Sequence, residues 1–327
     1  MKFLNDFILS INDFIWTYIL IAMLITIGVY FTFKTKFVQF TNFKEMFKLL
    51  GEGTGSENKD KSKNEISSFQ AFCIGTASRV GTGNLAGVAS AIAIGGPGAV
   101  FWMWLIALIG SASALIESTL AQIYKVKDGD NYRGGPAYYM EKGLKKKWMG
   151  VTFSVLIILC FGFAFNSVQS NTIVINYKSI PGLFKTIFEH AFGIKQFVGG
   201  GIGAALLQGI KRGLFSNEAG MGSAPNAAAT ATVSHPAKQG LIQTLGVFTD
   251  TLIICTSTAF IILLSGSNIP LDGSVKGIEL TQMALISQVG SWGGTFITIC
   301  ILLFAFSSII GNYYYGETNI QFISDKK

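Results

Sequence analysis

Long apolar stretches alternate with short polar ones along the whole chain. A helix needs about 20 apolar residues to cross the roughly 30 Å hydrocarbon core of a bilayer, and the first stretch, FIWTYILIAMLITIGVYFTF at 14–33, has that length. It is too long for the apolar core of a signal peptide, and no small-residue cleavage site follows it, so we expect it to be retained. The pattern predicts seven membrane-spanning helices, at 14–33, 68–95, 97–124, 149–175, 198–232, 239–264 and 292–316.

Two predicted spans are interrupted by glycine and polar residues: the second by SRVGTGNLAGVASAI (78–92) and the fifth by GIKRGLFSNEAGMGSAPNAAATA (209–231). Lipid cannot replace lost backbone hydrogen bonds, so such a break persists only where protein or a water-filled cavity lines it. The N-terminus of a half-helix attracts an anion such as a carboxylate, and unwound carbonyls can bind a cation. Close helix packing would explain one such break, but two, each opening a group of three spans, favour the ion and substrate site of a secondary transporter.

Composition agrees with a membrane protein. Of the 327 residues, 50% are hydrophobic and only 13% are charged, whereas a soluble domain carries about 25% charge. The net charge of +7 does not indicate nucleic-acid binding, because the basic residues lie mainly in loops between apolar stretches.

The distribution of basic residues predicts the orientation. With the N-terminus outside, 17 Lys and Arg residues fall in the inner loops and the C-terminal tail, and 5 fall in outer segments. Cytoplasmic loops carry the excess of basic residues. We therefore expect a multi-pass protein of the cell membrane with its N-terminus outside and its C-terminus inside, and a short amphipathic or re-entrant segment at 180–198.

Signals for enzyme chemistry are weak. The four cysteines fall inside apolar stretches, with spacings that match neither a zinc site nor a disulfide framework, so we interpret them as small core residues. His190 and His235 are not placed like catalytic bases, and the glycine-rich strings lack the Walker lysine and βαβ context of a nucleotide site. We expect no enzyme activity and no cofactor.

Five motifs resemble the alanine or glycine:cation symporter family: RVGTGNLAGVASAIAIGGPGAVFWMW, NYRGGPAYYMEKGL, RGLFSNEAGMGSAPNAAATA, SHPAKQGLIQTLGVFTDT and FAFSSIIGNYYYGE. The resemblance implies sodium-coupled uptake of small amino acids, chiefly alanine and glycine. It also implies the inverted-repeat fold of the bacterial leucine transporter, an all-α multi-pass membrane protein with two discontinuous helices. A single transmembrane transporter domain would cover 1–327, with an extra N-terminal span (14–33), a first repeat (68–175) and a second repeat (198–316).

The resemblance assigns a substrate pocket to the two breaks and the fourth span. Its residues would be Thr82 and Gly83, Phe165 and Gln169, and Phe215, Ser216 and Asn217. The backbone around Gly81 and Gly83 resembles a cradle for the substrate carboxylate, with Thr82 beside it. Phe215 resembles an aromatic lid or wall, and the two polar residues after it resemble contacts to the amino group or to an ion.

The resemblance also implies sodium as the coupling ion. The residues that resemble sodium ligands are the carbonyls near Ala77 and Val80, the side chain of Asn84, and the hydroxyl pair Ser307 and Ser308. The serine pair would tie the last predicted span to the first break. Carbonyl and hydroxyl oxygens are hard ligands, which suit an alkali cation.

Three acidic residues lie within predicted spans, where charged side chains are functional candidates. Glu117 either has such a role or makes a helix–helix hydrogen bond near the inner end of its span. Glu218 is expected to stabilise the second break by accepting backbone N–H bonds rather than to couple protons. Asp250 either faces the cavity or pairs with Arg79 or Lys211.

The chain is shorter than the resemblance implies. Family members continue through two more helices after a segment like VQSNTIVIN, whereas here Asn176 runs almost directly into SIPGLFKTIFEHAFG, and two further helices are expected after GETNIQFISDKK. Each repeat would keep its first three helices in their original orientation, giving about seven of the eleven expected spans.

Two functions follow from these observations. The first is a secondary active transporter that carries sodium with alanine or glycine into the cell by alternating access. The alternative is a non-transporting truncated remnant or pseudogene product retained in the membrane. The expected partners are the small amino acid, sodium and membrane lipid, with no nucleic acid.

Overall fold

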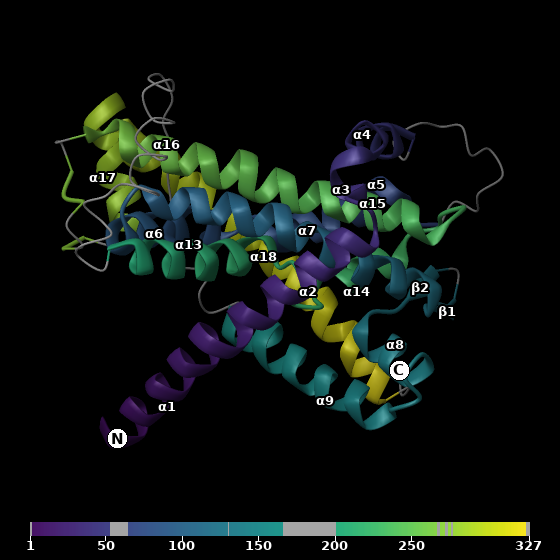
Figure 1. The fold of residues 1–327 in the computed structure, drawn as a ribbon. Coiled ribbons are helices and arrows are strands. Elements are labelled where there is room, and N and C mark those ends of the chain that lie inside the picture. Colours follow the sequence, from purple (N-terminus) through teal and green to yellow (C-terminus); the bar gives the residue numbers. More distant parts are fainter. Residues whose placement is uncertain are drawn as a thin grey trace.

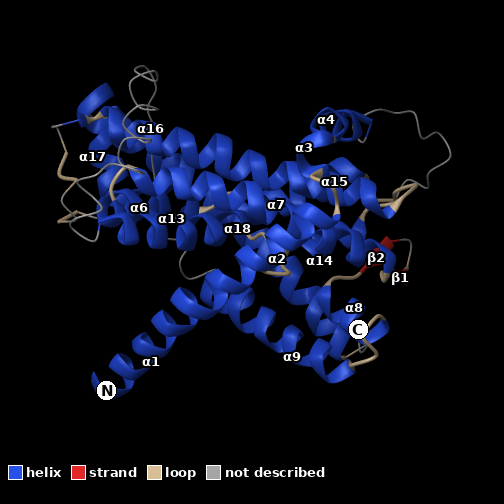
Figure 2. Cartoon of the chain, viewed as in Figure 1, coloured by secondary structure: helices blue, strands red, loops and turns tan. Residues whose placement is uncertain are grey.

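Helices make up nearly all of the regular structure (Figure 1, Figure 2). The computed structural model describes residues 2–52, 65–129, 131–165, 201–266, 269–271, 274–275 and 277–324. Within these residues the exception is one antiparallel hairpin of two short strands, β1 (Val126–Asp128) and β2 (Asn131–Arg133). It connects two helices and does not interrupt a predicted span.

The first predicted span is one continuous helix built from α1 (Lys2–Phe14), η1 (Ile15–Leu20) and α2 (Ile21–Lys34). The residues that join these parts keep right-handed helical dihedrals, so the wide π-helical turn of η1 does not break the helix. Gly28 lets α2 approach its neighbour closely, because a Cβ there would lie 2.7 Å from Cγ2 of Ile109.

The remaining helices fall into two groups, separated by residues 166–200. The first group comprises α3 (Val38–Thr41), α4 (Phe43–Glu52), α5 (Ser68–Arg79), η2 (Gly83–Gly87), α6 (Val88–Gly95), α7 (Gly98–Ile123), α8 (Pro136–Lys142), α9 (Lys147–Ile157) and η3 (Ile158–Phe165). The second group comprises α13 (Gly201–Asn217), α14 (Ala224–Thr230), α15 (Pro236–Phe248), η4 (Thr249–Cys255), α16 (Thr256–Leu264), α17 (Ile278–Val289) and α18 (Trp292–Ile323).

Helix α7 lies at the centre and packs against α2, α13, α14 and α15. Its small buried residues Ala107 and Ala114 form a cluster with Ala219 and Val247 from the second group. Small side chains let transmembrane helices approach closely. The packing on α7 therefore places this helix beside the second break, where Glu117 contacts the backbone N–H of Gly220.

Three described helices are long and apolar enough to cross a membrane: Asp6–Lys34, Gly98–Ile123 and Pro236–Leu264. They coincide with the first, third and sixth predicted spans. Shorter apolar helices at Gly83–Gly95 and Lys147–Phe161 fall in the second and fourth. Both predicted interruptions are confirmed, because the chain leaves the helix between α5 and η2 and again between α13 and α14.

Some segments predicted as loops contain regular structure. The stretch between the first two predicted spans, expected to be an inner loop, contains α4, which buries Met46 and Leu49 in a cluster with residues of α15. Such an amphipathic helix needs a single apolar face, which a mostly polar composition conceals. Two predicted segments, 166–175 of the fourth span and the re-entrant stretch 180–198, lie outside the described residues.

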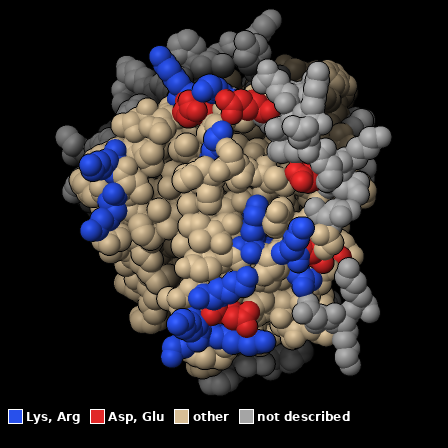
Figure 3. All heavy atoms as spheres, turned by 90° about the vertical axis from the view of Figure 1, so that its right-hand side faces the viewer, with Lys and Arg blue, Asp and Glu red and all other residues tan. Residues whose placement is uncertain are grey.

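Basic side chains gather at the end of the molecule that carries α4, the hairpin and α8 (Figure 3). The exposed ones include Lys44, Lys48, Lys127, Lys142, Lys145, Lys146 and Lys147. They come from two of the three predicted inner loops, so the fold brings these two loops to one end. The C-terminus lies at this end and the N-terminus lies away from it (Figure 1).

Candidate functional site

The first break follows the last turn of α5. Val80 adopts an extended conformation (φ −76°, ψ 92°), and the helix resumes after Thr82. Asn84 Oδ1 accepts a 2.8 Å hydrogen bond from the backbone N–H of Gly81 and so closes the turn. The last carbonyls of a helix lack helical partners and carry a partial negative charge, so this break presents carbonyl oxygens to the protein interior.

These carbonyls meet two serine hydroxyls of α18. Ser308 Oγ lies 3.1 Å from the carbonyl oxygen of Ala77. The same hydroxyl lies 3.3 Å from the carbonyl oxygens of Ser78 and Val80. Ser307 Oγ lies 3.5 Å from the Ala77 oxygen. We name these five residues the serine–carbonyl cluster.

The serine–carbonyl cluster has more acceptors than hydrogens. A serine hydroxyl donates one hydrogen, so Ser308 cannot satisfy three carbonyls at once. Carbonyl and hydroxyl oxygens are also the ligands that hard cations prefer. The composition and convergence of the cluster therefore fit an alkali cation.

The second break separates α13 from α14. Three of its residues have left-handed backbone conformations: Glu218 (φ 54°), Gly220 (φ 82°) and Gly222 (φ 78°). Glycine adopts this conformation without steric cost, which explains the spacing of the two glycines. Asn217 stabilises the turn, because its Oδ1 accepts a 3.0 Å hydrogen bond from the Ala219 N–H.

Asp250, in η4, connects the two breaks. Its Oδ1 accepts a 2.6 Å hydrogen bond from Asn84 Nδ2, and its Oδ2 accepts a 2.8 Å bond from Ser216 Oγ. Thr251 Oγ1 donates to the same Oδ2 at 3.2 Å. Cys255 Sγ lies 3.2 Å from Ser216 Oγ. All five side chains are buried; we name them the Asp250 cluster.

No basic side chain in the described parts of the chain forms an ion pair with Asp250. Arg79 Nη1 donates to the backbone oxygen of Gln243 at 3.4 Å, and Lys211 Nζ lies 3.2 Å from Asp13 Oδ1. The predicted alternative of pairing with Arg79 or Lys211 was therefore wrong. A carboxylate inside a membrane protein is costly without a partner, and a bound monovalent cation would supply one.

Glu117 and Glu218 both stabilise the second break, but Glu117 makes the backbone contact that was predicted for Glu218. Glu218 accepts hydrogen bonds from the hydroxyls of Ser78 (3.3 Å) and Ser223 (2.5 Å). Glu117 Oε1 accepts the backbone N–H of Gly220 at 3.1 Å. The prediction that Glu218 accepts backbone N–H bonds was thus wrong for the described contacts. Helix α7 passes beside the break, so Glu117 reaches those N–H groups, while Glu218 ties the second break to the first.

Phe215 lies against the first break. A Cβ on Gly83 would be 3.3 Å from its Cδ1, so the ring covers the glycine backbone that resembles a carboxylate cradle. Thr82 is buried beside Gly83. Asn217 belongs to the same region, because its Nδ2 donates to Thr251 Oγ1 at 3.1 Å. For the remaining pocket candidates, the side chain of Phe165 and the whole of Gln169 lie outside the described residues.

The structure adds polar residues that the sequence did not assign. Asn312 Oδ1 lies 3.0 Å from Ser78 Oγ and competes with Glu218 for its one hydrogen. Cys255 belongs to the Asp250 cluster rather than only to a core. A sequence signal existed for Asn312, because it follows Ser308 by one helical turn. For Cys255 there was none, since a cysteine in an apolar stretch is usually a packing residue.

The model of the Sodium:alanine symporter family matches residues 1–175 and 171–327. The chain belongs to this family. A probable sodium/glutamine symporter of Bacillus subtilis, GlnT, is 53% identical over 97% of this chain and 77% of its own length. The amino-acid carrier protein AlsT of the same organism is 50% identical over 100% and 80%. The sodium/alanine symporter AgcS of Methanococcus maripaludis is 32% identical over 97% and 83%.

Membership in the Sodium:alanine symporter family makes the chain a relative of sodium-coupled amino acid transporters, not of enzymes. The chain is shorter than these relatives. The alignment with GlnT spans 374 positions against 327 residues, so at least 47 positions of GlnT have no counterpart here. The two family matches overlap at 171–175. The family model therefore matches the chain in two parts that meet close to the internal gap predicted near Asn176.

Proposed function

We propose that this chain is a secondary active transporter that carries sodium together with alanine or glycine into the cell by alternating access. The observation that carries the proposal is the Asp250 cluster. One buried carboxylate accepts hydrogen bonds from Asn84 of the first break and Ser216 of the second. A ligand that changes the charge around Asp250 therefore acts on both breaks at once.

The proposed substrate position lies at the start of η2. The substrate carboxylate would meet the N–H groups around Gly83, where a helix begins and the dipole favours negative charge, while the N–H of Gly81 is bonded to Asn84. Phe215 would cover it, since the ring lies next to Gly83. Thr82, Ser216 and Asn217, with Phe165 and Gln169 of the fourth span, would complete the pocket.

The proposed sodium ligands fall in two places. In the serine–carbonyl cluster, the oxygens of Ala77, Val80, Ser307 and Ser308 would hold one ion by hard-ligand contacts. Asn84 would act in the Asp250 cluster, where a second cation would balance the carboxylate. The separation between α18 and the end of α5 would then depend on the ion.

We further propose that the chain is built as a partial inverted repeat, with a first repeat at 68–175 and a second at 198–316 after the extra span 14–33. A broken helix opens each repeat in this arrangement, α5–η2–α6 in one and α13–α14 in the other. We propose an outside N-terminus and an inside C-terminus, because the exposed lysines of two predicted inner loops share one end (Figure 3).

Uptake of radiolabelled alanine, glycine and glutamine into proteoliposomes tests the function. The proposal expects alanine and glycine to accumulate only with an inward sodium gradient, and to exceed glutamine. An immunoblot of the sealed vesicles verifies insertion. The shortened alignment fits the alternative, a non-transporting remnant, only weakly. Inserted protein that binds alanine with sodium but never accumulates it would support that alternative.

A further inference from the structure

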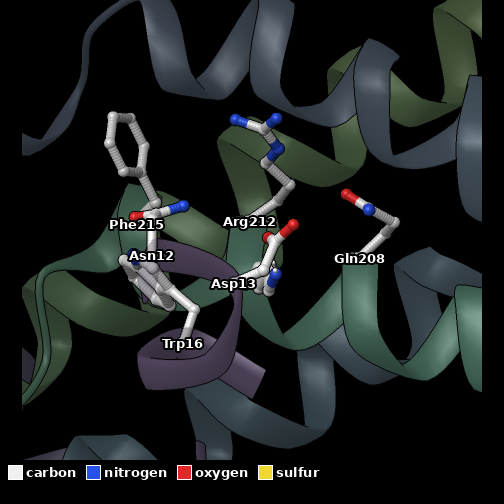
Figure 4. A pocket seen from close by; sticks show the side chains of 7 residues that line it. Asn12, Asp13, Trp16, Gln208, Arg212 and Phe215 are labelled. Carbon is white, nitrogen blue, oxygen red and sulfur yellow. Dashed lines mark hydrogen bonds and ion pairs between the residues drawn. The ribbon is translucent and has the colours of Figure 1, made fainter. Parts of the chain in front are cut away.

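A cavity of about 320 Å³ lies between the N-terminal helix and α13. Figure 4 shows the side chains around it: Asp13 and Trp16 come from the N-terminal helix, and Gln208, Arg212 and Phe215 come from α13. The volume falls within the roughly 300–1,000 Å³ of typical small-molecule sites. Both charged and apolar groups line it, which suits a small amphoteric ligand.

Within the described part of the chain, one cation of the cavity has no partner. Lys211 is already paired, since its Nζ lies 3.2 Å from Asp13 Oδ1. The neighbouring Arg212 is partly buried and has no hydrogen bond or ion pair with any described residue. An arginine fork binds a carboxylate through two parallel hydrogen bonds, so the unpaired guanidinium favours a carboxylate-bearing ligand.

Contacts of α13 place the cavity next to the first break. Phe215 lies against Gly83, and Arg212 lies one turn earlier with its Cδ 3.8 Å from the position of a Cβ on Gly87. One turn of α13, from Arg212 to Phe215, thus runs alongside η2 from Gly87 to Gly83. Phe215 lines the cavity on one side and covers the glycine break on the other, so it lies between the cavity and the break.

We propose that this cavity is a second, outer binding site for the amino acid substrate, in which Arg212 holds the α-carboxylate. The amides of Asn12 and Gln208 and the carboxylate of Asp13 are the groups available to its ammonium. An amino acid bound in this site is separated from the first break by the Phe215 ring, and movement of that ring lets the amino acid reach the break. The identity of the ligand rests on the proposed function, but its binding here requires neither transport nor sodium.

Protection of an introduced thiol tests this site. The reporter is Gln208→Cys in a chain whose exposed or partly exposed cysteines, Cys73, Cys160 and Cys300, are replaced by serine. The rate of reaction with N-ethylmaleimide is measured in detergent without sodium, with increasing alanine. Alanine is expected to slow the reaction. Adding Arg212→Gln should raise the half-protecting alanine concentration at least about tenfold, since contacts to charged groups are worth that factor.

Controls separate the ligand classes. Ethylamine, which lacks the carboxylate, should not protect, and Arg212→Lys should restore only part of the protection because it keeps the charge without the fork. Equal protection with Arg212→Gln, equal protection by ethylamine, chloride or phosphate, or a reporter that never reacts would each overturn the proposal. Failure of the proposed transport would appear separately, as absent uptake in vesicles with protection intact.

Discussion

Replacing Ser308 by alanine removes one oxygen from the serine–carbonyl cluster and leaves its carbonyls in place. The hydroxyl lies 3.1 Å from the Ala77 oxygen and 3.3 Å from the oxygens of Ser78 and Val80, so it contacts all three carbonyls of the cluster. Contacts to a charged group are worth about 1.5–3 kcal/mol, and about 1.4 kcal/mol is a factor of ten. We expect Ser308→Ala to raise the sodium concentration for half-maximal uptake about tenfold to a hundredfold.

Two measurements check the Ser308 prediction. Alanine uptake measured at increasing sodium concentrations directly gives the sodium concentration for half-maximal uptake. Sodium-dependent thermal stabilisation gives it without transport, because a ligand of the folded state stabilises in proportion to ln(1 + [L]/Kd). Ser307→Ala is the matched control: its hydroxyl is 3.5 Å from the Ala77 oxygen and also donates to Phe304 at 3.0 Å, so the effect should be smaller. An unchanged sodium dependence in well-folded Ser308→Ala protein would refute the ion position.

Three further outcomes are expected. Asp250→Asn keeps the side-chain shape but removes the charge shared by both breaks, so it should abolish sodium-dependent alanine binding without preventing insertion; wild-type binding curves would contradict the cation role. Gly83→Ala places a Cβ 3.3 Å from Phe215 Cδ1, so KM for alanine should rise and Phe215→Leu should restore it, whereas an unchanged KM would place the substrate elsewhere. Burial lowers the pKa of Lys125, in the loop after α7, from 10.5 to about 8. The unfolded chain therefore binds this proton more tightly between about pH 8 and 10.5, and the stability of the folded state should rise as the pH rises through that window. If the unfolding temperature depended on pH in the same way in wild type and Lys125→Met, this prediction would be refuted.

The positions of both breaks could be predicted from the sequence, because glycines and polar residues are unfavourable inside an apolar helix. The proximity of the serine pair to the end of α5 was also predictable, but only through resemblance. Nothing in the local pattern relates Ser308 to Ala77, which lies 231 residues away along the chain.

The choice of partner for each charged residue could not be predicted. Successive residues of a helix differ by about 100° in direction, so a small rotation decides whether Asp250 meets Asn84 or Arg79. Glu117 and Glu218 show the same limit. Either carboxylate could accept a backbone N–H of the second break. Because α7 passes beside the break, Glu117 accepts the N–H of Gly220.

One residue connects the serine–carbonyl cluster to the second break. The backbone oxygen of Ser78 belongs to the serine–carbonyl cluster, while its hydroxyl contacts Glu218 of the second break and Asn312 of α18. A cation that draws in the Ser78 carbonyl therefore also changes the position of the Glu218 contact.

The same connection bears on the shortened chain. Every residue of the serine–carbonyl and Asp250 clusters lies in α5, η2, α13, η4, α18 or the break after α5. The two family matches overlap at 171–175, which lies outside all of these. Both clusters are therefore complete in this shorter chain, whether or not it transports. We expect ion binding to be separable from transport: sodium-dependent stabilisation should persist even in a preparation that fails to accumulate alanine. Loss of both together would mean that the clusters do not hold an ion in this shorter chain.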